Sequence, residues 1–272
     1  MSAHSPERAA GISYVYAVGR AGTAPDASAT GLDGGALRTV CADGLAAVVS
    51  SVPEDAFSSE GMKAQMENLD RLEVLARAHH TVVAAAYESA TVLPMRLATV
   101  YLDDSRVEAM LHERRQDFGE LLSWLEGHVE LGVKVYADPQ RTAAAAPRPD
   151  APRPAAAESP GRAYLQQRRA RKRSHEDAYR AAGALAAEVS GRVSGIARAR
   201  VVHRPQQGEL ARAAGENVAN EAYLVPAARA DEFRQSLKGL ADDAGGVRIE
   251  ITGPWAPYSF ATPPDAREGG PQ

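Results

Sequence analysis

The sequence predicts an α+β protein of two domains, a ferredoxin-like N-terminal α/β sandwich and a smaller α+β C-terminal domain. Three observations lead to this prediction. Short stretches in which apolar residues alternate are interleaved with longer stretches in which they recur every three or four positions, a pattern typical of strands mixed with helices. A proline-rich segment divides the 272 residues near their middle. The chain also changes from acidic to basic across that segment.

The first domain, residues 1–138, is predicted to contain four strands and two helices. Alternating apolar and β-branched residues indicate strands at residues 12–18, 45–49, 97–102 and 131–136. A helical apolar repeat indicates amphipathic helices at residues 62–86 and 107–125. Pro94 cannot continue the first helix, and Asp103, Asp104 or Ser105 can cap the second. This order of elements favours a two-layer sandwich close to the ferredoxin-like architecture.

A linker and a smaller domain follow. Residues 139–160 hold six prolines among many alanines and no periodic large apolar residue, which predicts a semi-extended linker. The C-terminal domain is expected over residues 161–263, and residues 264–272 are expected to be a disordered tail. Its predicted helices are residues 164–189 and 231–240, and its predicted strands are residues 196–203, 221–226 and 247–251.

Charge and composition place limits on the class of protein. With 44% hydrophobic residues and a mean hydropathy of −0.32, the chain has the composition of a globular protein. Residues 1–137 carry 11 Lys and Arg against 19 Asp and Glu, a net charge of −8. The remaining residues carry 20 against 16, a net charge of +4, so the whole chain has the net charge of −4.

Targeting and redox features indicate a cytoplasmic protein. No apolar run approaches the ~20 residues that span a bilayer, so no membrane contact is expected. Residues 1–10 include Glu7 and Arg8 and lack the apolar core of a secretory signal. A single cysteine, Cys41, excludes an internal disulfide and a cysteine-based zinc site. Because no histidine or cation lies beside it in the sequence, Cys41 is expected to be a small buried or half-buried side chain.

No catalytic, cofactor-binding or metal-binding residues are predicted. The His79-His80 pair cannot chelate one ion because adjacent helical residues point about 100° apart, so we expect one packed and one exposed histidine. The carboxylate pairs Asp103-Asp104 and Asp242-Asp243 lie where helices begin or end, which capping explains. Phosphate-binding glycine loops and nucleophile elbows are absent from the sequence, so neither an enzyme nor a small-molecule substrate is expected.

Two segments are candidates for contact with a partner. The basic run at residues 168–173 is read as a solvated helix face, as a contact for an acidic partner that could be the acidic first domain, or as a nucleic-acid site. The segment from Gly253 to Phe260 holds three aromatic residues between two prolines that restrict its backbone. Its rings dock onto the core of their own domain or contact a partner, and the partner-contact candidates are Trp255, Tyr258 and Phe260.

The chain resembles the gas vesicle protein GvpL/GvpF family. The similarity rests on seven segments in order along nearly the whole length: Tyr14-Val15-Tyr16; His79 or His80 with Val82-Val83; Val92-Leu93-Pro94-Met95-Arg96-Leu97-Ala98-Thr99-Val100-Tyr101; Glu130-Leu131-Gly132-Val133-Lys134-Val135; Gly161-Arg162-Ala163-Tyr164-Leu165; Asn220-Glu221-Ala222-Tyr223-Leu224-Val225; and Gly253-Pro254-Trp255-Ala256-Pro257-Tyr258-Ser259-Phe260. Leu97-Ala98 departs from the Phe-Gly that many members have there, which affects local packing. These motifs do not separate an F-type from an L-type member.

The resemblance implies a non-enzymatic accessory protein of gas vesicle formation, a minor vesicle component in the cytoplasm. Its implied partners are the hydrophobic shell protein GvpA and other Gvp proteins during nucleation, without nucleic acid, membrane or cofactor. An unassembled shell subunit exposes strand edges and apolar surface. We therefore expect it to be held by strand addition at an open sheet edge, or by a helix in a groove, and most readily by the acidic N-terminal domain. Nucleic-acid binding through residues 168–173 is the alternative function.

Overall fold

The computed structural model describes residues 11–25, 28–138, 160–205, 215–242 and 244–261. These residues form two compact units, and the predicted α+β class is confirmed. Unit 2 spans Val129–Pro254 and is inserted in the sequence of unit 1, which comprises the residues before and after it. The predicted linker at residues 139–160 lies outside the described residues except for Pro160, and so does the predicted tail at residues 264–272.

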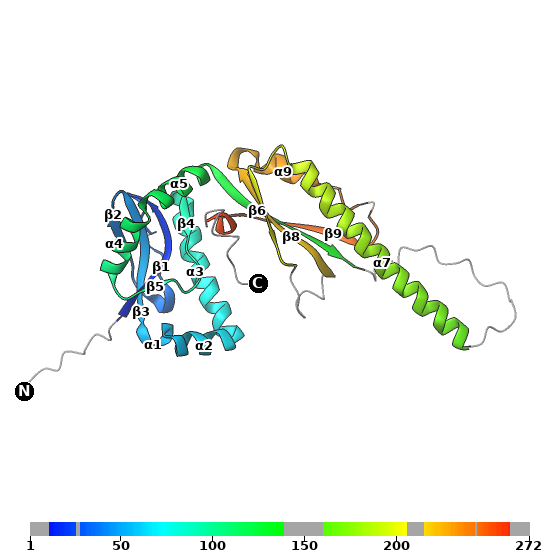
Figure 1. The fold of residues 1–272 in the computed structure, drawn as a ribbon, viewed down its shortest axis with the longest axis horizontal. Coiled ribbons are helices and arrows are strands. Elements are labelled where there is room, and N and C mark those ends of the chain that lie inside the picture. The colour runs from blue at the N-terminus through cyan, green and yellow to red at the C-terminus, as the bar shows by residue number, and fades with distance from the viewer. Residues whose placement is uncertain (1–10, 26–27, 139–159, 206–214, 243, 262–272) are drawn as a thin grey trace, which may run out of the picture. The chain divides into compact units, whose positions relative to one another are not determined.

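Unit 1 contains a five-stranded sheet with the order β2-β3-β1-β4, in which β5 also pairs with β1 (Figure 1). Its strands are β1 (Gly11–Arg20), β2 (Leu37–Ala42), β3 (Leu45–Pro53), β4 (Val92–Pro94) and β5 (Val100–Tyr101). Its helices are η1 (Leu32–Gly34), α1 (Glu54–Phe57), α2 (Ser59–Glu67), α3 (Leu69–Ser89), α4 (Asp104–Glu113), α5 (Arg115–Leu125) and η3 (Tyr258–Phe260). All of the strand pairs in this sheet are antiparallel.

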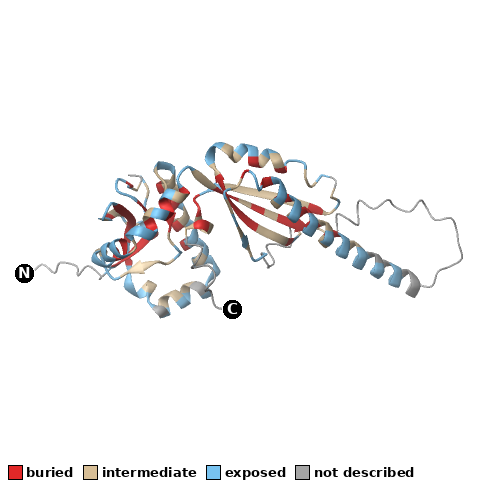
Figure 2. Cartoon of the chain, turned by 45° about the horizontal axis from the view of Figure 1, so that its top comes forward, coloured by how far each residue is buried: buried red, intermediate tan, exposed pale blue. Residues whose placement is uncertain are grey.

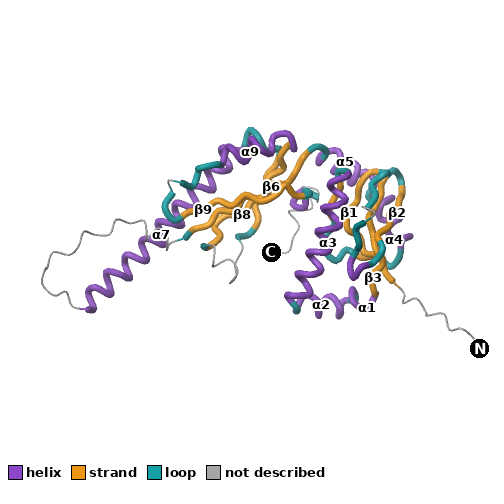
Figure 3. The backbone as a smooth tube through the Cα atoms, turned by 180° about the vertical axis from the view of Figure 1, so that it is seen from behind, coloured by secondary structure: helices purple, strands orange, loops and turns teal. Residues whose placement is uncertain are grey.

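Helices cover both faces of this sheet, so unit 1 has three layers where the sequence predicted two. Side chains alternate along β1: Tyr14 and Tyr16 pack with α3 residues in one hydrophobic cluster, whereas Ser13 donates a hydrogen bond to Asp104 on α4. Figures 1 and 3 both show α3 and α4 on opposite sides of the strands. Residues from both helix layers are therefore needed to cover a sheet that is apolar on both sides.

Three predicted elements of unit 1 were wrong in detail. The single helix expected at residues 62–86 is broken at Asn68, whose side-chain oxygen caps α3 by accepting from the backbone N–H of Arg71. The helix expected at 107–125 is likewise two helices, α4 and α5, and Asp103, one of the three predicted caps, caps α4. The strand expected at 97–102 is shortened to Val100–Tyr101.

Unit 2 has the strand–helix–strand–strand–helix–strand order of ferredoxin-like folds, with the sheet order β7-β8-β6-β9. Its strands are β6 (His128–Ala137), β7 (Ala199–His203), β8 (Glu216–Pro226) and β9 (Val247–Trp255), and its helices are α7 (Pro160–Val193), η2 (Ala227–Arg229) and α9 (Ala230–Leu237). The ferredoxin-like order thus occurs in unit 2, although we expected it in the N-terminal domain. The strand predicted at 131–136 is β6, an inner strand of this second sheet.

Candidate partner-binding surface

A buried hydrogen-bond chain lies beneath the candidate surface in unit 1. The Tyr14 hydroxyl lies 2.8 Å from Nδ1 of His79, and Nε2 of the same ring lies 3.2 Å from the carbonyl oxygen of Met95. Because a carbonyl only accepts, Nε2 carries the proton and Nδ1 accepts from Tyr14. Burial lowers the pKa of His79 to about 4, since it disfavours the cation. His79 is therefore a neutral, packed residue.

Tyr16 holds a second segment, at Leu32, beside this chain of hydrogen bonds. Its hydroxyl lies 2.8 Å from Oγ of Ser50 and accepts the backbone N–H of Leu32 at the same distance. Burial is the main cause that raises the pKa of both tyrosines, so their hydroxyls stay protonated. Gly31 leaves the space for this contact, because a Cβ there would lie 2.7 Å from the Tyr16 oxygen. The Tyr14-Val15-Tyr16 motif thus anchors neighbouring loops with buried hydroxyls.

The turn at residues 95–99 is held from below by these groups. The Tyr14 hydroxyl accepts the backbone N–H of Ala98 at 3.0 Å, and the backbone N–H of Met95 donates to the Tyr16 carbonyl at 2.9 Å. Ala98 has a φ of 63°, the left-handed region that a side chain disfavours. The predicted strand is interrupted for this reason, and the turn leaves Leu97 with 37% of its surface exposed.

The C-terminal aromatic segment, for which docking on its own domain core and contact with a partner were both open, packs on unit 1. The His80 ring meets the Trp255 ring edge-on at 5.4 Å, and its Nδ1 lies 3.2 Å from the Tyr258 hydroxyl. Phe260 is fully buried with its ring 6.0 Å from that of Trp124. Of the three predicted partner-contact residues, Trp255 is 41% exposed, Tyr258 is half-buried and Phe260 is inaccessible.

These segments meet around a shallow hollow of about 350 Å³. It is lined by Ala76, His79, His80, Met95, Arg96, Leu97 and Tyr258. We call the exposed and half-exposed residues here, together with the adjacent Trp255, the motif surface: Ala76, His80, Met95, Arg96, Leu97, Trp255 and Tyr258. Four of the seven family-like segments, which are scattered over 247 residues from Tyr14 to Phe260, contribute to it or support it from below. A surface that combines apolar side chains, two accessible aromatic rings and the exposed Arg96 is suited to bind another protein.

Two predictions about the exposure of single residues were wrong. His80 is half-buried where we expected one exposed histidine, and Cys41 is exposed where we expected a buried or half-buried side chain.

In unit 2, the buried carboxylate of Glu221 is bound by Arg200 at 2.5 and 3.0 Å and by the Tyr223 hydroxyl. The Asn220-to-Val225 segment therefore supports the unit 2 core. Sequence patterns did not reveal this ion pair because its partners are 21 residues apart.

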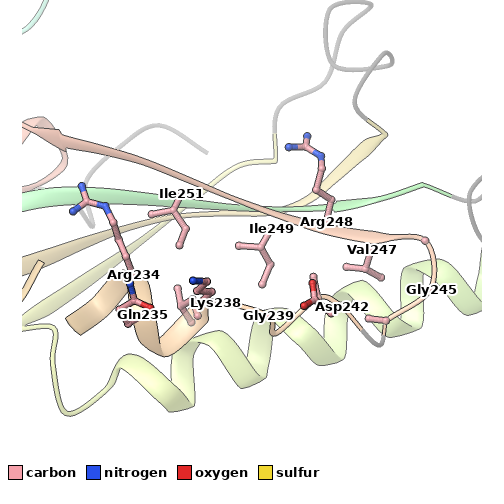
Figure 4. Close-up of a pocket in the computed structure, with 14 residues that line it drawn as sticks. Arg234, Gln235, Lys238, Gly239, Asp242, Gly245, Val247, Arg248, Ile249 and Ile251 are labelled. Atoms are coloured by element: carbon pink, nitrogen blue, oxygen red, sulfur yellow. The ribbon is translucent and has the colours of Figure 1, made fainter. Parts of the chain in front are cut away.

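A larger hollow, of about 830 Å³, lies between β9 and the chain that follows α9 (Figure 4). Ile249 and Ile251 of β9 face into it, while Arg234 and Lys238 come from α9 and its end. Its wall thus mixes apolar side chains with cations and the carboxylate of Asp242. In the described parts of the chain, no three His, Cys, Asp or Glu side chains are grouped to hold a metal ion. Among the same residues, the helices include none that is long and apolar enough to span a membrane.

Comparison with solved structures places this fold among gas vesicle proteins. The crystal structure of GvpF from Anabaena sp. PCC7120 matches with a TM-score of 0.63 at 17% identity, over 93% of this chain and 96% of that one. A family model described as gas vesicle synthesis protein GvpL/GvpF matches residues 12–262. The chain therefore belongs to the GvpL/GvpF family.

Two relatives from Streptomyces sp. (strain CB03234) refine this comparison. The chain is 41% identical to gas vesicle protein L over 252 residues, which are 92% of each chain. It is 28% identical to gas vesicle protein F of the same strain, over 82% of this chain and 87% of the relative. The sequence is thus more similar to the L-type relative than to the F-type one.

Proposed function

We propose that this chain is a non-enzymatic accessory protein that binds the shell protein GvpA, and other Gvp proteins, during gas vesicle formation in the cytoplasm. Family membership supports the gas vesicle role, and the higher identity to the L-type relative supports an L-type assignment. The convergence of four family-like segments on the motif surface carries the proposal of a binding role.

The motif surface is the proposed contact for the shell protein. Covering the apolar surface of a shell subunit is favourable by about 25 cal/mol per Å² removed from water. Leu97 and Trp255 offer accessible apolar area, and the Tyr258 hydroxyl and the His80 ring offer polar groups beside it. Such a site covers apolar surface on the shell subunit and releases the subunit when shell subunits pair with one another. We place the contact here rather than at the outer sheet strand β2.

Co-purification of the full-length chain with co-expressed GvpA tests this proposal. A Leu97→Ser, Trp255→Ala double variant should retain less than a tenth of the bound GvpA, because both residues are accessible and neither lies in the buried core. A Val202→Ser variant is the control, since it removes an exposed apolar group that belongs to unit 2 and not to the motif surface. Unchanged circular dichroism establishes that both variants fold. Equal GvpA recovery by the double variant and the wild type would contradict the proposed site.

A further inference from the structure

Helix α7 is much longer than the sheet against which it packs. Its C-terminal half is anchored by small and branched side chains in the unit 2 core, namely Ala178, Ala182, Leu185, Val189 and Val193. Residues 160–176, which we call the overhang, continue past the strands of that unit (Figure 1), and the described side chains there are almost all exposed (Figure 2). Isolated helices of this length are marginal in water, so a partner that covers the overhang would stabilise it.

The overhang has a chemical character different from the rest of α7. The three- and four-residue spacing that places Ala178, Ala182 and Leu185 against the sheet continues backward to Tyr164, Arg168, Arg171 and His175. Tyr164 and Leu165 are 64% and 51% exposed. An apolar sheet cannot accept this face because it carries two arginines. It fits an anionic surface that also has an apolar hollow.

Among the described residues, most of the cations on the overhang form no ion pair. All five members of the basic run at residues 168–173 are exposed. Lys172 pairs with Glu176 at 3.7 Å, but Asp177 pairs with Arg180 instead of with the basic run. Within the described residues, no ion pair involves Arg168, Arg169, Arg171 or Arg173. Among the described residues, ion pairs within the helix therefore leave most of the positive charge of the basic run unneutralised.

Unit 1 carries a surface of complementary chemistry. A hollow of about 260 Å³ lies among η1, α1, α2 and α3, with Phe57, Leu75 and Val74 in its wall and two carboxylates, Asp33 and Asp70, and one cation, Arg71, beside them. Leu69 and Val74 on α3 are 78% and 67% exposed. Helices α1 and α2 together carry one cation, Lys63, and four exposed carboxylates: Glu54, Asp55, Glu60 and Glu67. We call this the acidic groove.

We propose that the overhang of one copy of this chain docks into the acidic groove of a second copy. Tyr164 and Leu165 enter the apolar hollow, and the basic run faces the carboxylates of α1 and α2. Two such contacts related by a two-fold axis make a closed dimer, which goes beyond the proposed binding of the shell protein. Nucleic acid would engage the cations but would leave both the apolar residues and the acidic groove unused.

Charge exchange between the two surfaces tests the proposal in the full-length chain. An Arg168→Glu, Arg169→Glu, Arg171→Glu variant and a Glu54→Lys, Glu60→Lys, Glu67→Lys variant should each raise the dimer dissociation constant at least tenfold, measured by sedimentation equilibrium in 0.1 M salt. Mixing the two variants should restore association, because both contacts of the mixed dimer are again complementary. A Lys238→Glu, Arg204→Glu variant, which changes exposed cations elsewhere in unit 2, should dimerise like the wild type.

Disulfide trapping tests the register of the same contact. In a Cys41→Ala background, Leu165→Cys and Val74→Cys chains should form a mixed disulfide, and an Arg204→Cys chain should not. A wild type that stays monomeric, or a mixture of charge variants that fails to associate, would overturn the proposal. Loss of nucleic-acid binding in the arginine variant, with the glutamate variant unaffected, would overturn it in favour of a polyanion.

Discussion

The hydroxyl of Tyr14 on β1 and the imidazole of His79 on α3 are joined by a 2.8 Å hydrogen bond across 65 residues of sequence. Through this bond the strand and the helix together hold the turn that presents Leu97, since His79 binds the Met95 carbonyl and Tyr14 binds the Ala98 N–H. Both side chains are buried. The motif surface thus depends on a neutral histidine beneath it.

The stability of unit 1 should fall as the pH falls from 6.5 to 4. The pKa of His79 is lowered by burial from 6.5 to about 4, so the unfolded chain binds a proton in this range before the folded one does. The free energy of unfolding should therefore decrease by about 1.4 kcal/mol per pH unit, and by about 3 kcal/mol in total. Urea denaturation at half-unit intervals measures this slope.

A His79→Gln variant provides the control for this dependence. It should be less stable at pH 7 but should lose the slope between pH 6.5 and 4. Arg38 holds the pKa of Asp104 below its ordinary value of 3.8, so this carboxylate destabilises the fold only at still lower pH. A wild-type stability that is flat across the interval would contradict the assignment of His79 as a buried neutral base.

Replacing Tyr14 with Phe should destabilise unit 1 by about 2 kcal/mol. The ring still fits, but Nδ1 of His79 and the N–H of Ala98 lose their shared partner in a buried site. Chemical denaturation measures the change. Tyr164→Phe is the matched control, because that hydroxyl is on an exposed side chain and its loss should change stability by less than about 0.5 kcal/mol.

An Ala98→Gly variant should be more stable than the wild type by about 0.5 to 1 kcal/mol. Ala98 has a φ of 63°, and glycine removes the steric cost of that backbone conformation. Thermal unfolding compares the two proteins. The same exchange at Ala84, within α3, should instead cost about 1 kcal/mol because glycine disfavours a helix interior. Destabilisation by Ala98→Gly would show that the turn is not strained.

The two ends of the C-terminal aromatic segment should respond differently to truncation. Phe260→Ala should cost about 3 to 4 kcal/mol, since the ring is fully buried beside Trp124. Trp255→Ala should cost about 1 kcal/mol, because 41% of its surface is already exposed. Limited proteolysis should cleave after residue 255 faster in the Phe260 variant only. Equal cleavage of both variants would mean that Phe260 does not anchor the segment.

Local signals in the sequence predicted the local structure well. The α+β class, one packed histidine in the His79-His80 pair and a helix cap within residues 103–105 follow from residue spacing and capping chemistry alone. Strand β2 was missed because Arg38, Thr39 and Cys41 give it no apolar alternation. The break at Asn68 was missed because the apolar repeat continues through it, and only the cap interrupts the helix.

Patterns in the sequence did not predict which elements far apart in the chain pack together. The strand at residues 131–136 has a clear pattern, but pattern does not say which sheet a strand joins, and β6 lies in unit 2. The aromatic segment begins within β9, and its packing on α3 of unit 1 depends on contacts with residues about 180 positions earlier, such as that between Tyr258 and His80. No local property of the segment encodes such a contact.

The return of the chain to unit 1 after Pro254 has a consequence for biosynthesis. The ribosome must translate all of unit 2 before Ala256 and Phe260, which fill the first unit, are available. The nascent N-terminal part therefore emerges incomplete, while the inserted unit can fold first. Fragments that stop near residue 138 lack these side chains, so a shortened chain leaves apolar surface uncovered where the full-length product has none.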